Sequence, residues 1–120
     1  METTLDVTAA QARVRHGAAF LDGAYLGWRE HIDVNTLDMT DSRRCVLGQL
    51  APAWMGDESA GYGDVIESLG WSEWTAHEHG FIVTDESAEW DDGYDHLATA
   101  RLAPLWVSEI MGDSNTPTGP

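Results

Sequence analysis

The chain has 120 residues, with 21 acidic and six basic side chains and a formal net charge of −15 at pH 7. Hydrophobic residues make up 42% of it and six residues are tryptophans, so it has enough apolar material for one folded core, which argues against a disordered chain. The charge disfavours direct binding to DNA or RNA, because contacts with phosphates require clustered lysine and arginine.

The negative charge is concentrated in the second half of the chain. Between Cys45 and Ala100 there is no lysine or arginine, whereas the residues before Cys45 include seven acids and five arginines. The twelve carboxylates of this stretch are Asp57, Glu58, Asp64, Glu67, Glu73, Glu78, Asp85, Glu86, Glu89, Asp91, Asp92 and Asp95. Unpaired carboxylates repel one another and steer basic partners inward. The pattern therefore indicates a basic partner.

Three features indicate a cytoplasmic location. No apolar run approaches the roughly 18 residues of a membrane span. The first residues, METTLDVT, lack the basic start and apolar block of a signal peptide. The lone Cys45 cannot form an internal disulfide, which suits a reducing compartment. We therefore expect a cytoplasmic protein without a membrane partner.

The first predicted element is a helix that begins near residue 7. Its apolar residues recur at steps of three and four, the rhythm of one helix face. They are Val7, Ala10, Val14, Ala18, Leu21, Tyr25, Trp28 and Ile32. Gly23 and Gly27 predict a break or bend before Trp28. Residues 33–41 are polar and turn-like, with a short extended piece as the alternative.

A short helix is predicted next, from a cap at Asp41 or Ser42 to Pro52. Its apolar residues are Val46, Leu47 and Leu50. Pro52 should end it, because proline has no amide hydrogen and its ring clashes with the preceding turn. Gly48 lies in the helix interior, where glycine is costly, so we expect close packing over its missing side chain.

Glycines mark the ends of two further predicted helices. The first has apolar residues at i, i+3, i+4 and i+7 and ends at Gly70, and the second is capped by Ser72 and ends at Gly80. The apolar positions of the first are Tyr62, Val65, Ile66 and Leu69. An aromatic residue follows each glycine, Trp71 and Phe81, at a position that often packs back on the finished helix.

The last predicted helix covers about residues 92–111, and Pro104 should kink it or restart it one turn later. Its apolar face is formed by Tyr94, Leu97, Ala98, Leu105, Trp106 and Ile110. We expect residues 112–120 to be a flexible tail. These elements predict an all-α, compact single domain over residues 1–111, built from four to six mostly short helices. A small strand pair that uses residues 81–84 is the main alternative.

A group of histidines and acids offers atoms of the kind that bind zinc. Its members are His77, Glu78, His79, Asp91, Asp92, Asp95 and His96. On a helix, however, His77 and His79 point about 200° apart. The HExxH spacing that brings two histidines to one ion is absent. We therefore interpret them as surface residues and expect no metal and no other cofactor.

Two further motifs have a weaker functional interpretation. Asp33-x-Asn35 starts as a calcium loop does, but Asp38 stands where such a loop requires glycine, so we expect a turn. Cys45 lies near Arg43 and Arg44, where a thiolate is favoured. Its other neighbours are apolar and no histidine is placed as a base, so burial as a packing residue is the better interpretation. We expect no enzymatic activity.

The tryptophans fall into two groups. Trp28, Trp71 and Trp106 fit the apolar stripes of the predicted core. A second group lies in acidic surroundings: Trp54, Trp74 and Trp90. Exposed aromatics among carboxylates are a common composition of protein interfaces, because aromatic anchors supply binding energy. Packing over small satellite clusters explains the second group equally well.

Several short fragments occur in a recognisable order along the chain. They are GAAFLD (17–22), Gly27-Trp28, IDVNTLDM (32–39), CVLGQL (45–50), LGW (69–71), HGF (79–81) and a closing Leu105, Trp106, Glu109 and Ile110. This order resembles short uncharacterised proteins encoded by actinobacteria and actinobacteriophages. The resemblance implies an origin on a phage or in a phage-carrying host, and hence a bacterial cytoplasm. It implies no activity and no role for any single residue.

Three functions fit the sequence. The favoured one is a non-enzymatic binding protein whose carboxylate-rich second half docks on a basic surface of a host protein, such as a nucleic-acid site that it would occlude. We expect its partner-binding residues to be Asp85, Glu86, Glu89, Trp90, Asp91, Asp92 and Asp95. The second is an acidic globular protein whose charge serves solubility, with a partner bound through an apolar patch. The third is a small metal- or thiol-dependent enzyme.

Overall fold

The structure is a computed structural model in which residues 7–84 and 95–111 are described. Within these ranges it contains helices and no strand, which confirms the predicted all-α fold, and residues 81–84 are irregular. The helices are α1 (Val7–Ala24), α2 (Trp28–His31), α3 (Val46–Met55), α4 (Tyr62–Leu69), α5 (Glu73–Glu78), α6 (His96–Ala100) and α7 (Leu102–Met111). The predicted tail at 112–120 lies outside the described residues. None of the described helices is long and apolar enough to cross a membrane.

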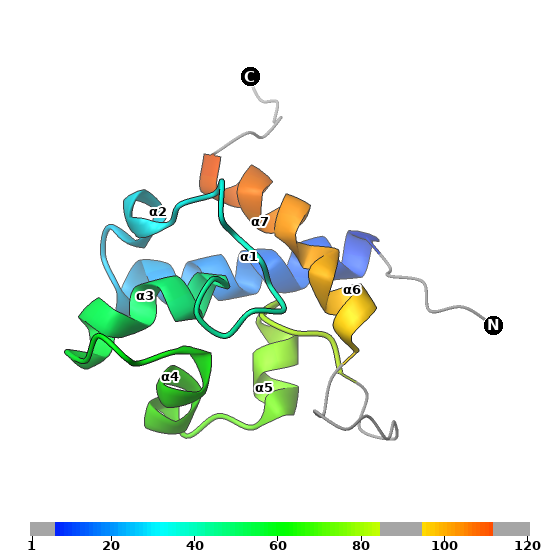
Figure 1. The fold of residues 1–120 in the computed structure, drawn as a ribbon. Coiled ribbons are helices and arrows are strands. Elements are labelled where there is room, and N and C mark those ends of the chain that lie inside the picture. Colours follow the sequence, from blue (N-terminus) through cyan, green and yellow to red (C-terminus); the bar gives the residue numbers. More distant parts are fainter. Residues whose placement is uncertain (1–6, 85–94, 112–120) are drawn as a thin grey trace.

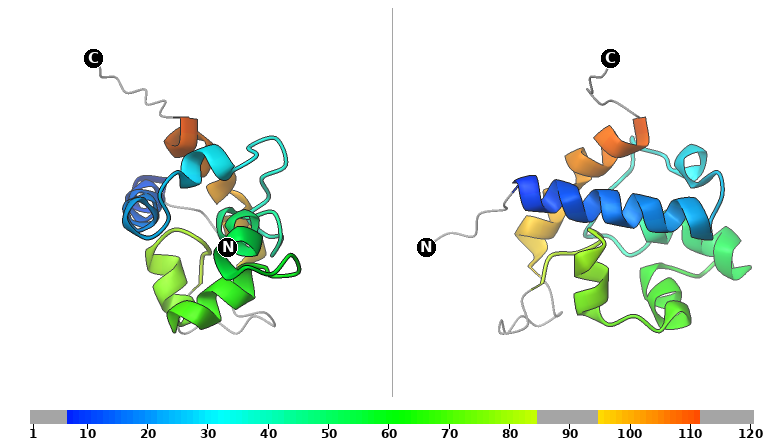
Figure 2. Two further views of the ribbon diagram at one scale, coloured as in Figure 1. Left: turned by 90° about the vertical axis from the view of Figure 1, so that its left-hand side faces the viewer. Right: turned by 180° about the vertical axis from the view of Figure 1, so that it is seen from behind.

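The helices are arranged around α1, which crosses the molecule (Figure 1). α7 and α5 both pack against α1, while α3 and α4 pack mainly against each other. The views in Figure 2 place α4 and α5 below α1, and α2 and the end of α7 above it. The edge formed by α4 and α5 is therefore separate from the part of the fold that contains α2.

Trp106 of α7 lies at the centre of the core. Its buried ring stacks on Phe81 at a centroid distance of 5.1 Å, and Trp28 of α2 meets it edge-on at 5.8 Å. The indole N–H of Trp106 donates to the carbonyl oxygen of Gly80 at 2.7 Å, so the single polar atom of the ring is satisfied. These contacts join α2, α7 and the turn after α5, and they confirm Trp28 and Trp106 as core residues.

The predicted break in the first helical segment is confirmed. α1 ends at Ala24 and α2 begins at Trp28, with Gly27 before it at φ 79°. This left-handed conformation is one that glycine adopts without strain. Gly23, by contrast, lies inside α1. The turn at Gly27 reverses the chain, so that Trp28 reaches the core.

The predicted start of α3 is wrong. Its N-cap is Cys45, whose Sγ accepts a hydrogen bond from the N–H of Gly48 at 3.3 Å, and not Asp41 or Ser42. Asp41 and Ser42 belong to the turn before the helix. The backbone of this turn occupies the space where a side chain on Gly48 would lie, so the expected close packing at Gly48 is confirmed.

The predicted end of α3 is also wrong. The helix passes through Pro52, continues to Met55, and closes at Gly56 with φ 69°. Beyond the proline, the ring of Trp54 packs edge-on against Tyr25 at 5.4 Å. This packing beyond the proline offsets the one backbone hydrogen bond that proline cannot donate.

The two helices predicted from their closing glycines end as expected. Gly70 follows α4 at φ 71° and Gly80 closes the turn after α5 at φ 76°. The Ser72 Oγ accepts a backbone hydrogen bond at 3.2 Å, which confirms Ser72 as the N-cap of α5. The N–H of Phe81 then donates back to the carbonyl of Ala76 at 3.0 Å, which brings the Phe81 ring onto the core.

The last helix begins later than predicted and is interrupted. Its first part, α6, begins at His96 with Asp95 as the N-cap, and not near residue 92. It stops at Ala100, and α7 starts at Leu102. The interruption lies one turn before Pro104 and not after it, because the proline ring conflicts with the carbonyl of Ala100, four residues earlier.

Candidate functional site

Most residues of the predicted partner-binding group lie outside the described part of the chain. They are Asp85, Glu86, Glu89, Trp90, Asp91 and Asp92. Asp95 is described and is 8% exposed. Its Oδ1 accepts the N–H of Ala98 at 3.1 Å, and its own N–H donates to the carbonyl of Val83 at 2.7 Å. The Asp95 carboxylate is therefore occupied in capping α6.

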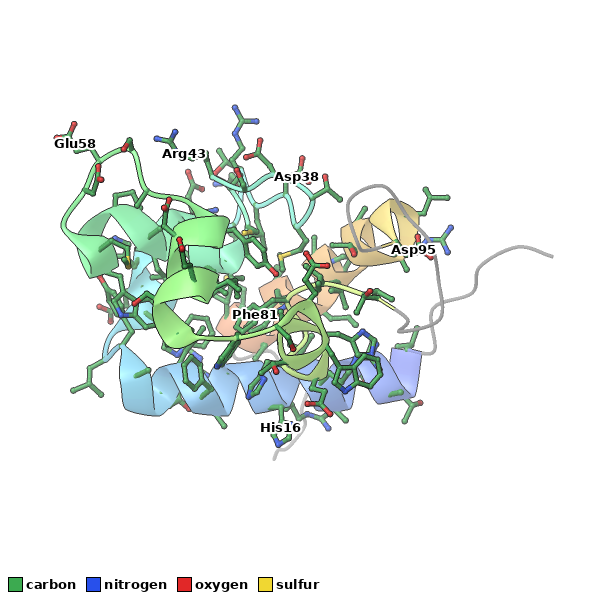
Figure 3. The ribbon with its side chains drawn as sticks, turned by 90° about the horizontal axis from the view of Figure 1, so that it is seen from below. His16, Asp38, Arg43, Glu58, Phe81 and Asp95 are labelled. Carbon is green, nitrogen blue, oxygen red and sulfur yellow. The ribbon has the colours of Figure 1, made fainter. Side chains whose placement is uncertain are left out.

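A group of six exposed carboxylates is carried by α4, α5 and the turn before α4. We call it the acidic face, and it consists of Asp57, Glu58, Asp64, Glu67, Glu73 and Glu78. Two lie in the turn before α4, two on α4 and two on α5. Figure 3 views the fold from below, with Glu58 at an outer corner and Arg43 beside it. Asp64 and Glu67 are three residues apart and so are neighbours on one helix face.

No carboxylate of the acidic face forms an ion pair with a described residue. The ion pairs in the described ranges join Arg29 to Asp22 and Glu109, and Arg44 to Asp41. Arg43 borders the face, but its guanidinium donates to the carbonyl of Glu58 at 3.1 Å and not to a carboxylate. The positive charges near the face therefore leave most of its negative charge uncompensated.

Two members of the acidic face have local structural roles. Asp57 Oδ1 accepts the backbone N–H of Ser59 at 2.9 Å and its hydroxyl at 2.8 Å, and these hydrogen bonds lower the pKa of Asp57 below its usual value. Asp64 Oδ2 accepts the N–H of Gly61 at 2.9 Å and helps to start α4. Within the described residues, the four glutamates of the face accept no hydrogen bond, so their carboxylates are available to a partner.

An exposed tryptophan stands among these carboxylates. Trp74 is 39% exposed, and its ring stacks on His77 with a centroid distance of 4.7 Å and an interplanar angle of 20°. The Nδ1 of His77 accepts the N–H of Thr84 at 3.0 Å, which fixes the orientation of the imidazole. Glu73 and Glu78 of the same helix flank the pair. The sequence signal for this group is the spacing i, i+3 and i+4 from Trp74 to His77 and Glu78.

His77 and His79 have different neighbours, as their spacing predicts. The ring of His79 stacks on Trp71 at 4.5 Å and on His16 at 5.5 Å, and its Nδ1 lies 2.9 Å from the carbonyl of Thr75. Among the described residues there is no group of three or more potential ligands that could hold a metal ion. Of the predicted ligands, Asp91, Asp92 and the side chain of His96 are not described.

Cys45 is a packing residue, as predicted. It is buried, and burial raises the pKa of its thiol to about 12, so that the thiolate is not formed near neutral pH. The Asp33–Asn35 segment is also a turn, as expected, because the Asp33 Oδ1 accepts the N–H of Asn35 at 3.0 Å.

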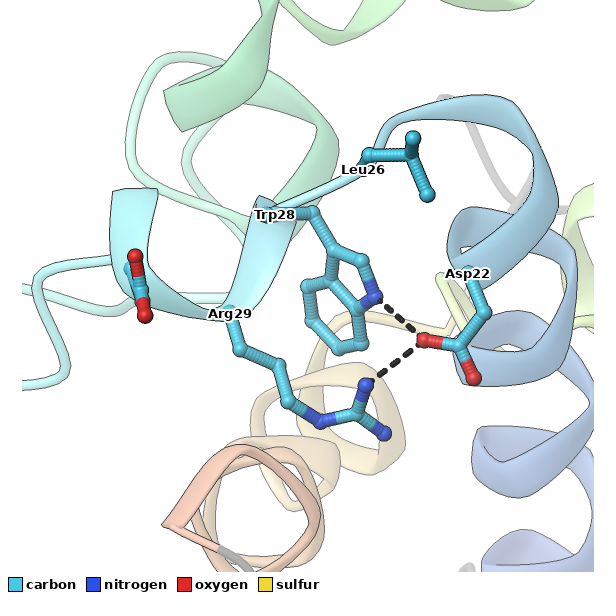
Figure 4. Close-up of a pocket in the computed structure, with 6 residues that line it drawn as sticks. Asp22, Leu26, Trp28 and Arg29 are labelled. Carbon is cyan, nitrogen blue, oxygen red and sulfur yellow. Dashed lines mark hydrogen bonds and ion pairs between the residues drawn. The ribbon is translucent and has the colours of Figure 1, made fainter.

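A shallow pocket of about 240 Å³ lies at the turn between α1 and α2 (Figure 4). Asp22 Oδ1 accepts the indole N–H of Trp28 at 2.9 Å and a guanidinium N–H of Arg29 at 2.6 Å. These bonds, first that of Trp28 and then that of Arg29, lower the pKa of Asp22. The guanidinium of Arg29 also lies over the Trp28 ring at 4.6 Å. The charges that line the pocket therefore largely satisfy each other.

Comparisons with protein-family models, with curated proteins and with solved structures found no match to the chain. The resemblance to actinobacterial and actinobacteriophage proteins therefore stays a prediction from the sequence. The features that bear on function are the acidic face, the exposed Trp74, and the ion pairs that engage Arg29 and Arg44.

Proposed function

We propose that this protein is a non-enzymatic binding protein whose carboxylate-rich second half docks on a basic surface of another protein. The observation that carries the proposal is the pairing of charge. The exposed glutamates of the acidic face accept no hydrogen bond and form no ion pair within the described residues, whereas Arg29 and Arg44 of the first half are paired. An uncompensated carboxylate surface attracts a basic partner during encounter.

The position of the acidic face supports the same function. Its carboxylates come from α4, α5 and the turn before α4, and both helices lie on the same side of α1 (Figure 2). A partner approaching this side meets charge together with one exposed aromatic ring, Trp74, and interfaces commonly combine these two features. Nucleic-acid sites of proteins are basic, so a face of this kind would occlude such a site. In keeping with the resemblance, we propose that the partner is a cytoplasmic protein of an actinobacterial host.

The proposal is tested by capture of the partner with matched single variants. Glu67 on α4 and Glu30 on α2 are both exposed glutamates on helices, and neither accepts a hydrogen bond within the described residues. Immobilised wild-type protein, Glu67→Lys and Glu30→Lys are exposed to an actinobacterial lysate at low salt and eluted at high salt. We expect a host protein that the wild type and Glu30→Lys retain and that Glu67→Lys retains less.

Retention that is lost in Glu30→Lys but kept in Glu67→Lys would show that the acidic face does not contact the partner. Glu30 is a better control than Asp22, Asp33 or Asp38. The carboxylates of those three residues bind Trp28, the N–H of Asn35 and the N–H of Thr40, so their replacement would also disturb the fold.

One observation favours the second candidate function, a partner bound through an apolar patch. Leu26, in the turn after α1, is 85% exposed, and Met55 at the end of α3 is 36% exposed. The contact of Tyr25 with Trp54 brings these two segments together. If this patch is the binding site, Leu26→Ser will abolish capture, while Glu67→Lys will leave it unchanged.

A further inference from the structure

Trp74 is an exposed aromatic residue on a helix that also carries two exposed glutamates, Glu73 and Glu78. The Trp74 ring is 39% exposed and is supported on one side by the stacked imidazole. The N–H of Thr84 donates to Nδ1 of His77 at 3.0 Å, and this hydrogen bond holds the imidazole in place beside the indole.

The carboxylates beside Trp74 complete the chemistry for a cation. Glu78 lies four residues after Trp74 and so on the same side of α5, and Glu73, at the start of the same helix, adds a second negative charge. Both are exposed, and neither forms an ion pair with a described residue. A planar cation that stacks on the indole is therefore attracted by negative charge carried on the same helix.

The same protein already uses this arrangement internally at α2. There the guanidinium of Arg29 lies 4.6 Å from the centroid of the Trp28 ring, while its N–H donates to Asp22 at 2.6 Å. In that group the tryptophan, the cation and the carboxylate all come from the chain itself (Figure 4). At α5 the tryptophan and the carboxylates are present, and no arginine among the described residues lies over the Trp74 ring.

We infer that the Trp74 ring and the carboxylates of Glu73 and Glu78 receive an arginine side chain of the basic partner. This inference rests on the proposed function and specifies the group that the acidic face recognises. Arginine fits better than lysine, because its planar guanidinium stacks on an indole and donates along two edges at once, whereas an ammonium is a strongly hydrated point charge. Charge alone would not distinguish the two.

The test compares two flexible peptides of equal charge, one of alternating arginine and glycine and the other of alternating lysine and glycine. Their affinities for the full chain are measured by calorimetry at low salt, and the indole N–H signal of Trp74 is followed by NMR. We expect the arginine peptide to bind roughly three- to tenfold more tightly than the lysine peptide and to shift the Trp74 signal.

Two variants separate stacking from charge. Trp74→Leu should remove the preference for arginine while leaving the affinity for the lysine peptide nearly unchanged. Glu67→Gln, which removes a charge on α4 away from the ring, should weaken both peptides by the same factor. The NMR signal of wild-type Trp74 keeps the test valid if Trp74→Leu is less stable.

The failure of this inference differs from the failure of the proposed function. Equal affinities for the two peptides, with an unshifted Trp74 signal and weaker binding by Glu67→Gln, would contradict the arginine site and leave the acidic face in place. Absence of binding to either peptide at low salt would contradict both.

Discussion

Gly17 and Gly23 lie on the same helix but have opposite surroundings. A Cβ on Gly17 would collide with the carbonyl oxygen of His79 and would lie 3.0 Å from the ring of Trp106. A Cβ on Gly23 would meet nothing within 4 Å. Gly17 is therefore required for the close approach of α1 to the end of α5, and Gly23 is not.

This contrast gives a matched pair of substitutions. Gly17→Ala should destabilise the protein by about 1–3 kcal/mol, because the backbone of His79 has to move. Gly23→Ala should stabilise it by roughly 0.5–1 kcal/mol, because alanine restricts the unfolded chain and favours the helix. Urea denaturation followed by circular dichroism measures both. Equal effects of the two substitutions would show that α1 does not pack on the His79 turn as described.

Cys45 gives a second prediction at the residue scale, concerning pH. Burial raises the pKa of the thiol from an ordinary 9.0 to about 12, so the folded chain keeps this proton after the unfolded chain has lost it. The folding stability that depends on the buried, protonated thiol is fully present below about pH 9. It is lost as the pH rises towards 12, at about 1.4 kcal/mol per pH unit. Urea denaturation between pH 8 and pH 10.5 should show this slope, and Cys45→Ala should flatten it (~1.4 kcal/mol per unit less). An unchanged slope in Cys45→Ala would place the thiol in contact with water.

At the scale of elements, some helix boundaries are set by local sequence signals and others by tertiary packing. The ends of α4 and α5 follow from Gly70 and Gly80, because a left-handed residue terminates a helix whatever surrounds it. Pro52 fails as a stop signal because its effect is a single lost hydrogen bond, which the packing of Trp54 against Tyr25 offsets. That contact joins residues far apart in the chain, so no local pattern contains it.

The cap of α6 provides the prediction at this scale. The Asp95 carboxylate accepts the N–H of Ala98, so Asp95→Ala should cost about 1 kcal/mol of folding stability. Asp95→Asn keeps an oxygen in the same place and should cost much less. Thermal denaturation of both variants is the measurement. A loss in Asp95→Asn as large as that in Asp95→Ala would mean that the negative charge, and not the hydrogen bond, is what the position requires.

The candidate site was only partly predictable from the sequence. The charge asymmetry located the acidic half, because composition needs no knowledge of the fold. It could not identify which carboxylates are already engaged: Asp95, Asp64 and Asp57 accept hydrogen bonds from nearby backbone N–H groups. Nor could it separate Trp74, which is exposed, from Trp54, which packs on Tyr25, since both occur in similar acidic surroundings.

At the scale of the whole molecule, the net charge of −15 opposes folding, because exposed carboxylates repel one another in the compact state. Salt screens this repulsion over about 10 Å at 0.1 M. The melting temperature near neutral pH should therefore rise with added sodium chloride, by roughly 4 °C for each 1 kcal/mol of repulsion removed. A variant with Glu67, Glu73 and Glu78 changed to glutamine should melt higher at low salt and respond less. A melting temperature that does not rise with salt would mean that the carboxylates are paired or well separated.

The rate of association with the captured partner tests the central claim most directly. If the acidic face steers docking, a variant with Glu67→Lys, Glu73→Lys and Glu78→Lys should associate about tenfold more slowly at low salt, with a smaller change in dissociation. The difference should shrink as the ionic strength rises, and Glu30→Lys should change the rate far less. Association that is equally fast in the triple variant and the wild type, at every salt concentration, would contradict docking through the acidic face.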